Sequence, residues 1–288
     1  MTLPPLLALM RPQQWVKNAF VAAPLFFTPP AFTTLNLLVV LGGIVSFSLL
    51  SSAVYIVNDY MDREADRAHP AKAKRPLAAG TVSPGQALGL LVLVLAVGFA
   101  LAFALSLDFA LVGALYVAIN LGYSTWLKNF AIVDVMLIGF SFVLRVKAGA
   151  HLIEIEPSAW IMIVTGLLAL FLALAKRRDD LVRSLDENHR RSLNGYSPEF
   201  LDIAVAVVLG AMLVAYMVYT TDRQVMAAMG TERLFYTVPF VIAGILRYLQ
   251  ITLVEKRSGS PTAMVMSDRF LLITILLWAG TFAVLIHG

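Results

Sequence analysis

The sequence contains no cysteine in 288 residues, which excludes disulfide bonds, thiolate nucleophiles and cysteine-based metal sites. Charged residues are also scarce, at 14% of the chain, whereas hydrophobic residues make up 59%. At a mean hydropathy of +0.81, almost no water-soluble fold could bury this much apolar surface. No hydrophilic stretch is long enough for a separate soluble domain, and we expect no cleavable signal peptide. The sequence therefore predicts a single integral membrane domain over residues 1–288.

Apolar runs of about 18 to 22 residues recur along the chain, long enough to cross a hydrocarbon core of about 30 Å. They predict an all-α, polytopic membrane protein built as a nine-transmembrane-helix bundle. Eight spans are the alternative, because Pro24, Pro29 and Pro30 interrupt the first run. The predicted spans are 18–34, 37–57, 86–106, 109–127, 132–150, 158–175, 201–221, 234–254 and 268–286.

Basic residues are distributed unequally between the predicted loops. Most of the 22 lysines and arginines lie at the N-terminus and after the second, fourth, sixth and eighth spans. By the positive-inside bias these parts face the cytoplasm. The pI near 9.4 is explained by these loops facing anionic lipid headgroups, so no nucleic-acid partner is expected. The two most hydrophilic loops, 58–85 and 176–200, are expected to form a polar cap over the active site.

Three aspartates directly follow the second predicted span. On a helix, Asp59, Asp62 and Asp66 point within about 60° of one another, so their charges repel unless a cation lies between them. Clustered carboxylate oxygens with room for phosphate suit Mg²⁺. We therefore predict that these residues are both the metal ligands and the catalytic residues, with Asn58 as a polar neighbour that contacts the substrate. The alternative is a solvated helix end without a binding role.

Basic residues accompany both polar loops. Lys74 and Arg75 follow the acids, and Lys176 and Arg177 begin the second loop; their side chains are candidates for holding phosphate groups. Adjacent aspartates at 179–180 project about 100° apart on a helix, so the second loop suits anionic groups better than a second metal. A purely topological role is the alternative for both basic sets, and the role of the two aspartates stays open. In the first loop, the histidine at position 69 is more often incidental than a ligand.

Two smaller polar clusters are expected to border the same cavity. At the N-terminus, Arg11, Gln14 and Lys17 either anchor the chain at the membrane interface or cup a lipid phosphate. Tyr123 and Lys128 precede the fifth span and are further candidates for substrate binding.

The fifth predicted span contains three charged residues. An isolated carboxylate inside a span, such as Asp134, is costly and is expected to be functional or paired. Arg145 and Lys147 lie near the outer end of this span, where we expect them to snorkel outward and to be structural.

The spacing of these residues resembles a known family. The pattern Asn58-Asp59-x-x-Asp62-x-x-x-Asp66, the downstream segment 74–77 (KRPL), and Tyr123-Ser124 with Lys128 resemble the UbiA-type intramembrane prenyltransferase superfamily. The resemblance covers essentially the whole chain. It implies a nine-helix bundle in which two acidic motifs hold Mg²⁺-diphosphate over a cavity open to lipid.

The second motif departs from the usual pattern of that superfamily. Residues 176–180 read KRRDD, where aromatic prenyltransferases have a second Asp-x-x-x-Asp. With the segments 11–18, 66–70 and 261–269, this departure is similar to the decaprenyl-phosphate phosphoribosyltransferase branch. That branch implies Mg²⁺-dependent transfer of 5-phosphoribose from 5-phosphoribosyl 1-diphosphate to a polyprenyl phosphate, releasing diphosphate, at the cytoplasmic face of a bacterial plasma (inner) membrane.

The charge distribution agrees with this branch, because a donor diphosphate, a 5-phosphate and a lipid phosphate are three anionic groups. Our mechanistic hypothesis takes Arg11, Gln14 and Lys17 as candidates for holding the acceptor phosphate. Candidates for holding the donor phosphates are Lys74, Arg75, Lys176 and Arg177, and the sequence leaves open which basic residue holds which phosphate. Two other functions remain open: transfer from a prenyl diphosphate to an aromatic acceptor, and transport of an anionic metabolite or lipid. The length of the polyprenyl chain, the use of the product and assembly into a homo-oligomer are left open by the sequence.

Overall fold

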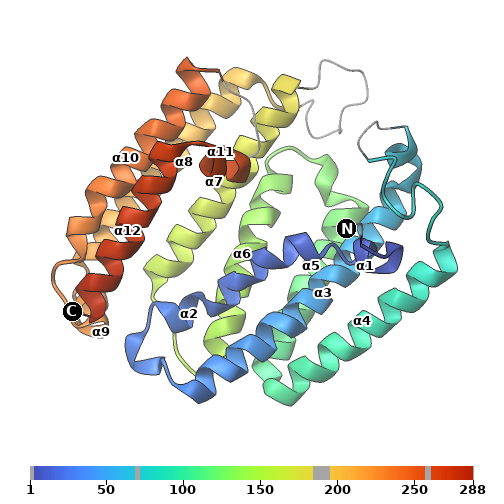
Figure 1. Ribbon diagram of the computed structural model, residues 1–288, viewed down its shortest axis with the longest axis horizontal. Helices are drawn as coiled ribbons and strands as arrows, with labels where there is room; N and C mark the ends of the chain where they lie inside the picture. The colour runs from blue at the N-terminus through green and yellow to red at the C-terminus, as the bar shows by residue number, and fades with distance from the viewer. Residues whose placement is uncertain (1–2, 69–71, 184–194, 257–260, 288) are drawn as a thin grey trace. The chain divides into compact units, whose positions relative to one another are not determined.

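The computed structural model describes most of the chain and shows only helices there (Figure 1). The histidine at 69 and much of the second polar loop lie outside the described residues. Contacts divide the chain into two compact units, each described here by itself. Unit 1 comprises Met1–Phe27, Ala31–Lys128 and Leu144–Pro157; unit 2 comprises Thr28–Pro30, Asn129–Val143 and Ser158–Gly288. The described ranges are 3–68, 72–183, 195–256 and 261–287.

Unit 1 is built around one long helix, α3, which packs against α4, α5 and the 3-10 helix η1. Phe47 of α3 lies at the centre of the apolar core, with its ring 6.0 Å from that of Phe109 and 4.8 Å from that of Tyr116. The helices are α1 (Pro5–Leu9), η1 (Pro12–Ala22), α2 (Ala23–Phe26), α3 (Thr34–Arg67), α4 (Pro84–Leu105), α5 (Leu107–Thr125) and η3 (Leu127–Asn129). The short η2 (Pro29–Ala31) and helix α6 (Val133–Leu152) contribute residues to both units.

In unit 2, α7 packs against α8 and α10 packs against α12. Its core includes the edge-to-face pair of Phe171 and Tyr248, whose ring centres are 4.8 Å apart. A π-helical turn, η6, directly continues α10. The helices are α7 (Ala159–Arg183), α8 (Pro198–Thr221), α9 (Arg223–Met229), η5 (Leu234–Thr237), α10 (Val238–Leu249), η6 (Gln250–Val254), α11 (Pro261–Ser267) and α12 (Arg269–His287).

Local sequence signals explain where several long helices begin. The side chains of Thr33, Ser106 and Ser197 accept hydrogen bonds from backbone N–H groups in the first turns of α3, α5 and α8. Before α4, Ser83 and Gln86 form a reciprocal capping box, and proline follows at the first helical position. These caps satisfy N–H groups that have no partner inside the helix.

Seven helices in the described ranges are long and apolar enough to cross a membrane. In α4 and α12 only 17% of the most apolar window is buried, and side chains such as Leu88 and Leu276 are exposed, as lipid-facing side chains are. The predicted count of nine spans is not confirmed. The seven helices are Thr34–Arg67, Pro84–Leu105, Leu107–Thr125, Ala159–Val182, Pro198–Thr221, Leu234–Val254 and Arg269–Ile286.

The two predicted spans outside this set are 18–34 and 132–150. The first is not one long helix: the segment divides into the end of η1, the short α2 and η2. Pro24, Pro29 and Pro30 explain the division, because proline lacks the N–H that a continuing helix needs. The second corresponds to α6, a 20-residue helix.

The charged residues of α6 differ from expectation in one respect. Asp134 is paired, as predicted, and its partner is Arg177. Lys147 pairs with the exposed Glu156 at 3.2 Å. Arg145, however, does not snorkel outward. Its side chain is only 3% exposed and hydrogen-bonds inside unit 1 to Asn18 and Tyr116.

Candidate active site

The acidic residues occupy the last turns of α3, which continues beyond its apolar run to Arg67. Asp59 and Asp66 are buried, with exposed fractions of 2% and 3%, and the side chain of Asp62 is 26% exposed. Burial of an ionised carboxylate is costly unless a cation or several hydrogen bonds compensate it. Each of the three therefore needs a partner, and the structure supplies one.

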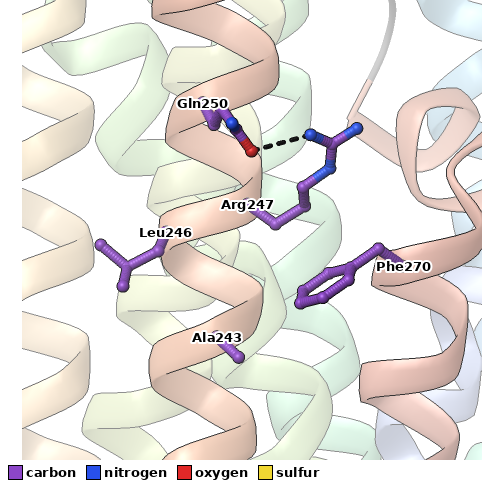
Figure 2. A pocket seen from close by; sticks show the side chains of 5 residues that line it. All are labelled: Ala243, Leu246, Arg247, Gln250 and Phe270. Carbon is purple, nitrogen blue, oxygen red and sulfur yellow. Dashed lines mark hydrogen bonds between the residues drawn. The ribbon is translucent and has the colours of Figure 1, made fainter.

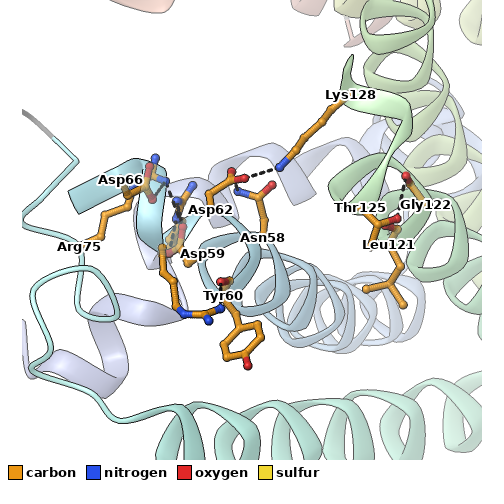
Figure 3. Close-up of polar contacts among 12 residues, drawn as sticks. Asn58, Asp59, Tyr60, Asp62, Asp66, Arg75, Leu121, Gly122, Thr125 and Lys128 are labelled. Carbon is orange, nitrogen blue, oxygen red and sulfur yellow. Dashed lines mark hydrogen bonds and ion pairs between the residues drawn. The ribbon is translucent and has the colours of Figure 1, made fainter. Parts of the chain in front are cut away.

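Asp59 and Asp66 are paired with arginines from outside α3. Arg11 forms an ion pair with Asp59 through Nη2, and its Nε donates to the second carboxylate oxygen at 3.3 Å. Arg75 bridges the two acids: its Nη1 lies 3.2 Å from Asp59 Oδ1 and 2.6 Å from Asp66 Oδ2 (Figure 3). The loop that follows α3 thus folds back, so that its Arg75 contacts the last turns of the same helix.

Asp62 has a separate set of partners. The Nζ atom of Lys128, in η3, forms an ion pair with Asp62 Oδ1, and Asn58 Nδ2 donates to Oδ2 at 3.1 Å (Figure 3). Lys128 is itself 9% exposed. Three predicted site residues from two segments, Asn58, Asp62 and Lys128, therefore form one hydrogen-bonded group.

The acids and their partners balance in charge. Asp59, Asp62 and Asp66 meet Arg11, Arg75 and Lys128, so three negative groups face three positive ones within unit 1. In the described ranges, no three histidine, cysteine or acidic side chains converge closely enough to form a metal site by themselves. A metal ion held by these aspartates would therefore need further oxygen ligands, such as substrate phosphate oxygens or water.

The donor set nevertheless fits Mg²⁺ brought by a phosphorylated substrate. Mg²⁺ in proteins is usually bound by one or two carboxylates together with substrate phosphate oxygens and water, and a closed protein cage is not required. Asp59, Asp62 and Asp66 offer hard oxygen ligands at one helix end, and the neighbouring guanidinium groups suit phosphate.

The N-terminal cluster is held beside the acids by η1. Arg11 precedes Pro12 with φ of 52°, a left-handed conformation that is strained for a residue with a side chain. Its guanidinium lies 5.4 Å from the centre of the Tyr55 ring, in addition to its pair with Asp59. Gln14 is half-buried and Lys17 is exposed. Strain of this kind persists where surrounding contacts enforce it, as at binding sites.

The other two predicted residues of unit 1 lie close to this group in sequence. Lys74, next to Arg75, is exposed and has no ion-pair partner in the described part of unit 1. Tyr123 is half-buried in the last turn of α5, shortly before Lys128. In the same turn the hydroxyl of Thr125 donates to the carbonyls of Leu121 and Gly122 (Figure 3).

The second basic set lies in unit 2, at the end of α7. Lys176 is exposed, whereas the side chain of Arg177 is 2% exposed and its Nε donates to Asp134 Oδ2 at 2.6 Å. Arg178 forms an ion pair with Asp202 of α8. Asp180 also lies near Arg177, at 3.4 Å from its Nη1.

Tyr196 completes this buried network and was not anticipated from the sequence. Its hydroxyl donates to Asp134 Oδ1 at 2.7 Å and accepts the N–H of Ile132 at 2.6 Å. Burial, followed by the hydrogen bond to Asp134, raises the pKa of Tyr196, so the phenol remains a donor at neutral pH. The cost of an unpaired carboxylate at Asp134 was a sequence signal that partners exist, but it did not identify them.

Unit 2 also contains an open pocket between α10 and α12. Ala243, Leu246, Arg247, Gln250 and Phe270 line it, and Arg247 donates to Gln250 (Figure 2). The guanidinium of Arg247 is also paired with Asp268 and Glu255, each at 2.7 Å. This pocket contains none of the predicted site residues, and its cation is already matched by two carboxylates.

The sequence model of the UbiA prenyltransferase family matches residues 16–286. The chain belongs to this family. The decaprenyl-phosphate phosphoribosyltransferase of Corynebacterium glutamicum is 35% identical over 93% of the chain and 82% of its own length. The Mycolicibacterium smegmatis protein of the same name is 32% identical over 98% of the chain and 92% of its own length.

A solved UbiA homologue from Archaeoglobus fulgidus, bound to DMAPP and Mg²⁺, has a TM-score of 0.73. It is 20% identical and the match covers 98% of the chain and 99% of the homologue, so it supports the fold. The seven apolar helices of the chain and its place in the UbiA family show that it is a multi-pass membrane protein. The names of its relatives show that it is an enzyme of the transferase class.

Proposed function

We propose that this UbiA-family protein transfers 5-phosphoribose from 5-phosphoribosyl 1-diphosphate to a polyprenyl phosphate of the decaprenyl type and releases diphosphate. The observation that carries the proposal is the pair of relatives named decaprenyl-phosphate phosphoribosyltransferase, at 32–35% identity over most of the chain. Transfer from a prenyl diphosphate to an aromatic acceptor is the alternative within the same family.

The charges around the end of α3 support this proposal. The reaction brings together three anionic groups: the donor diphosphate, the 5-phosphate and the lipid phosphate. Within unit 1, Arg11, Arg75 and Lys128 contact the acids directly, and Lys17 and Lys74 are exposed nearby in sequence. Basic side chains of this number suit several phosphates better than a single diphosphate and a neutral ring.

In the proposed reaction the bond from the anomeric carbon to the diphosphate oxygen breaks, and a bond from that carbon to a lipid phosphate oxygen forms. Mg²⁺ held by Asp59, Asp62 and Asp66 would stabilise the charge on the departing diphosphate. Arg75 and Lys128 leave their carboxylate partners to bind donor phosphates, with Lys74 assisting. The acceptor phosphate is already ionised at neutral pH, so no general base is required; Arg11, Gln14 and Lys17 orient it.

The remaining predicted residues receive narrower roles. Asn58 orients Asp62 through its hydrogen bond. Tyr123, close to Lys128 in the sequence, offers its hydroxyl to the substrate. Lys176, which is exposed, is proposed to bind a donor phosphate, while Arg177 acts by holding the end of α7 through Asp134. No role is assigned to Asp179 or Asp180. We also propose that the N-terminus and the active site face the cytoplasm, because most of the basic residues lie in loops on that side.

Label transfer by purified protein in detergent tests the function. With Mg²⁺, polyprenyl phosphate and radiolabelled 5-phosphoribosyl 1-diphosphate, we expect label to enter the organic phase, and chelation of the metal to stop it. A sample without the lipid phosphate serves as the control. Consumption of a prenyl diphosphate with an aromatic acceptor, without phosphoribose transfer, would establish the alternative.

The shared use of the carboxylates predicts competition between Arg75 and divalent metal. Arg75→Gln leaves the carboxylates of Asp59 and Asp66 without their bridging cation, so we expect Mn²⁺ to bind about ten- to a hundredfold more tightly when no donor is present. Affinity for the donor is expected to fall, because Arg75 no longer reaches a phosphate. Titration calorimetry measures both.

Lys74→Gln is the matched control for this substitution. It removes the same charge from the neighbouring position, but Lys74 contacts none of the three aspartates. Metal affinity without donor should therefore stay at the wild-type value. Equal metal affinities in wild type and Arg75→Gln would show that the arginine and the metal do not compete.

A further inference from the structure

Helix η1, which carries the residues proposed to hold the acceptor phosphate, is unusual in its length. It is a 3-10 helix of 11 residues, Pro12–Ala22, whereas 3-10 helices longer than about three to four residues are uncommon because their hydrogen bonds are poorly aligned. A helix of this kind depends on contacts with its surroundings. The contacts of η1 therefore decide where Arg11, Gln14 and Lys17 lie.

The first of these contacts is a buried hydrogen-bond junction at Asn18. This residue is fully buried, and its amide nitrogen donates to the hydroxyls of Ser48 and Ser51 of α3 at 3.0 and 3.1 Å. Its amide oxygen accepts from Nε of Arg145, in α6, at 2.9 Å. Both ends of one side chain are thus used to join η1 to two different helices.

Arg145 is fixed independently of η1. Its Nη2 donates to the hydroxyl of Tyr116 at 3.0 Å, and its guanidinium lies 4.8 Å from the centre of the Tyr116 ring and 5.7 Å from that of Phe47. Helix α6 corresponds to a predicted span, and a buried arginine inside a span is costly and is usually retained for a function. Here the ring faces of Phe47 and Tyr116 hold the guanidinium so that its Nε reaches Asn18, and the Tyr116 hydroxyl accepts a hydrogen bond from its Nη2.

A second contact lies one turn further along both helices. Gly149 of α6 approaches the backbone of η1 so closely that a Cβ atom at this position would lie 1.8 Å from the carbonyl oxygen of Val21. Arg145 and Gly149 are four residues apart, one turn of an α-helix, and Asn18 and Val21 are three apart, one turn of a 3-10 helix. The two helices therefore meet in register at two successive turns.

We propose that Arg145 and Gly149 are positioning residues that hold η1 in register with the acidic end of α3 and thereby set the affinity for the acceptor lipid phosphate. The link to the acceptor rests on the proposed function; the link to η1 rests on the contacts alone. Arg11 lies at the start of η1 and contacts both carboxylate oxygens of Asp59 through Nη2 and Nε. Movement of η1 therefore displaces the Arg11 guanidinium from this carboxylate.

Distances between two spin labels test the positioning without any substrate. The chain has no cysteine, so cysteines introduced at Val16 of η1 and Leu88 of α4, both exposed and both in unit 1, can be labelled selectively. In Arg145→Gln and Gly149→Ala we expect a broader or shifted distance distribution. The Arg145→Gln variant is included in case Gly149→Ala does not fold. It removes the guanidinium that contacts Asn18 without adding volume. An unchanged distribution in a folded Arg145→Gln protein would overturn the proposal.

Two matched controls separate positioning from general stability. Lys147→Gln removes a charge from the same helix at a residue paired with exposed Glu156. Tyr116→Phe removes the hydrogen bond that Nη2 of Arg145 donates, but it keeps the aromatic ring and the contact of Arg145 with η1. Both controls should retain the wild-type distances. If Tyr116→Phe broadens them as much as Arg145→Gln does, Arg145 acts through general packing and the proposal is wrong.

Steady-state kinetics then test the effect on the acceptor. For Arg145→Gln we expect KM for polyprenyl phosphate to rise at least about tenfold, with KM for 5-phosphoribosyl 1-diphosphate within about twofold of wild type. Equal losses for both substrates would overturn the assignment to the acceptor. If the wild type transfers no phosphoribose, the proposed function fails, and the label distances alone decide the positioning role.

Discussion

Asp59→Asn is expected to lower the rate of phosphoribosyl transfer by about a hundredfold to a thousandfold. Asp59 is buried and contacts two arginines, Arg11 and Arg75. The amide keeps the shape of the side chain but removes the charge that a metal ligand and an arginine partner require. The rate is measured by transfer of label from 5-phosphoribosyl 1-diphosphate into the lipid phase at saturating Mg²⁺.

Glu64→Gln provides the control for this variant. Glu64 lies on the same helix but is exposed, and among the described residues its ion pairs are with Arg63 and Arg67. It carries the same charge outside the proposed site, so we expect activity close to wild type. Wild-type activity in Asp59→Asn would show that the acidic end of α3 does not hold the donor complex.

Arg177→Met is expected to reduce the free energy of unfolding by about 3–5 kcal/mol. Asp134 is fully buried in unit 2, and the substitution removes the guanidinium that contacts it at 2.6 Å. The methionine side chain retains most of the apolar volume, so the loss reports the uncompensated charge. Reversible unfolding in mixed micelles, monitored by circular dichroism, gives the difference.

Two further variants identify the cause of that loss. Lys176→Met changes the exposed neighbour and should shift stability by less than about 0.5 kcal/mol, while weakening donor binding. Replacing both members of the pair, with Asp134→Leu added to Arg177→Met, should recover most of the stability. If Arg177→Met instead unfolds like wild type and loses only donor affinity, Arg177 is a phosphate ligand, as the sequence pattern alone predicted.

Much of the fold could be predicted because a helix that crosses the membrane needs an apolar run of about 20 residues, which is visible in the sequence. Helices α4, α5, α7, α8 and α12 coincide closely with predicted apolar runs. The prediction of one continuous span over residues 18–34 was wrong. Hydropathy reports how apolar the side chains are and does not report whether the backbone hydrogen bonds of a helix can continue. Pro24 and the prolines at 29 and 30 interrupt that continuity, and only short helical pieces remain.

The candidate site was predictable in its residue types but not in its pairing. The helical spacing of Asp59, Asp62 and Asp66 fixed their common location at the end of α3. It carried no information on which distant cation would reach which acid. Arg11 and Lys128 are separated from their partners by 48 and 66 residues, so chain folding alone brings them together.

The sequence by itself determined that this is a helical membrane protein with an acidic helix end and basic segments, because apolar length, charge bias and helical period are local properties. Only the tertiary structure decided which charges are bound inside the protein. Arg177 and Arg145 read from the sequence as a phosphate ligand and a snorkelling side chain, yet both are buried in hydrogen-bonded contacts. The physical reason is that the cost of a buried charge depends on partners that packing supplies, and those partners lie far away in the chain.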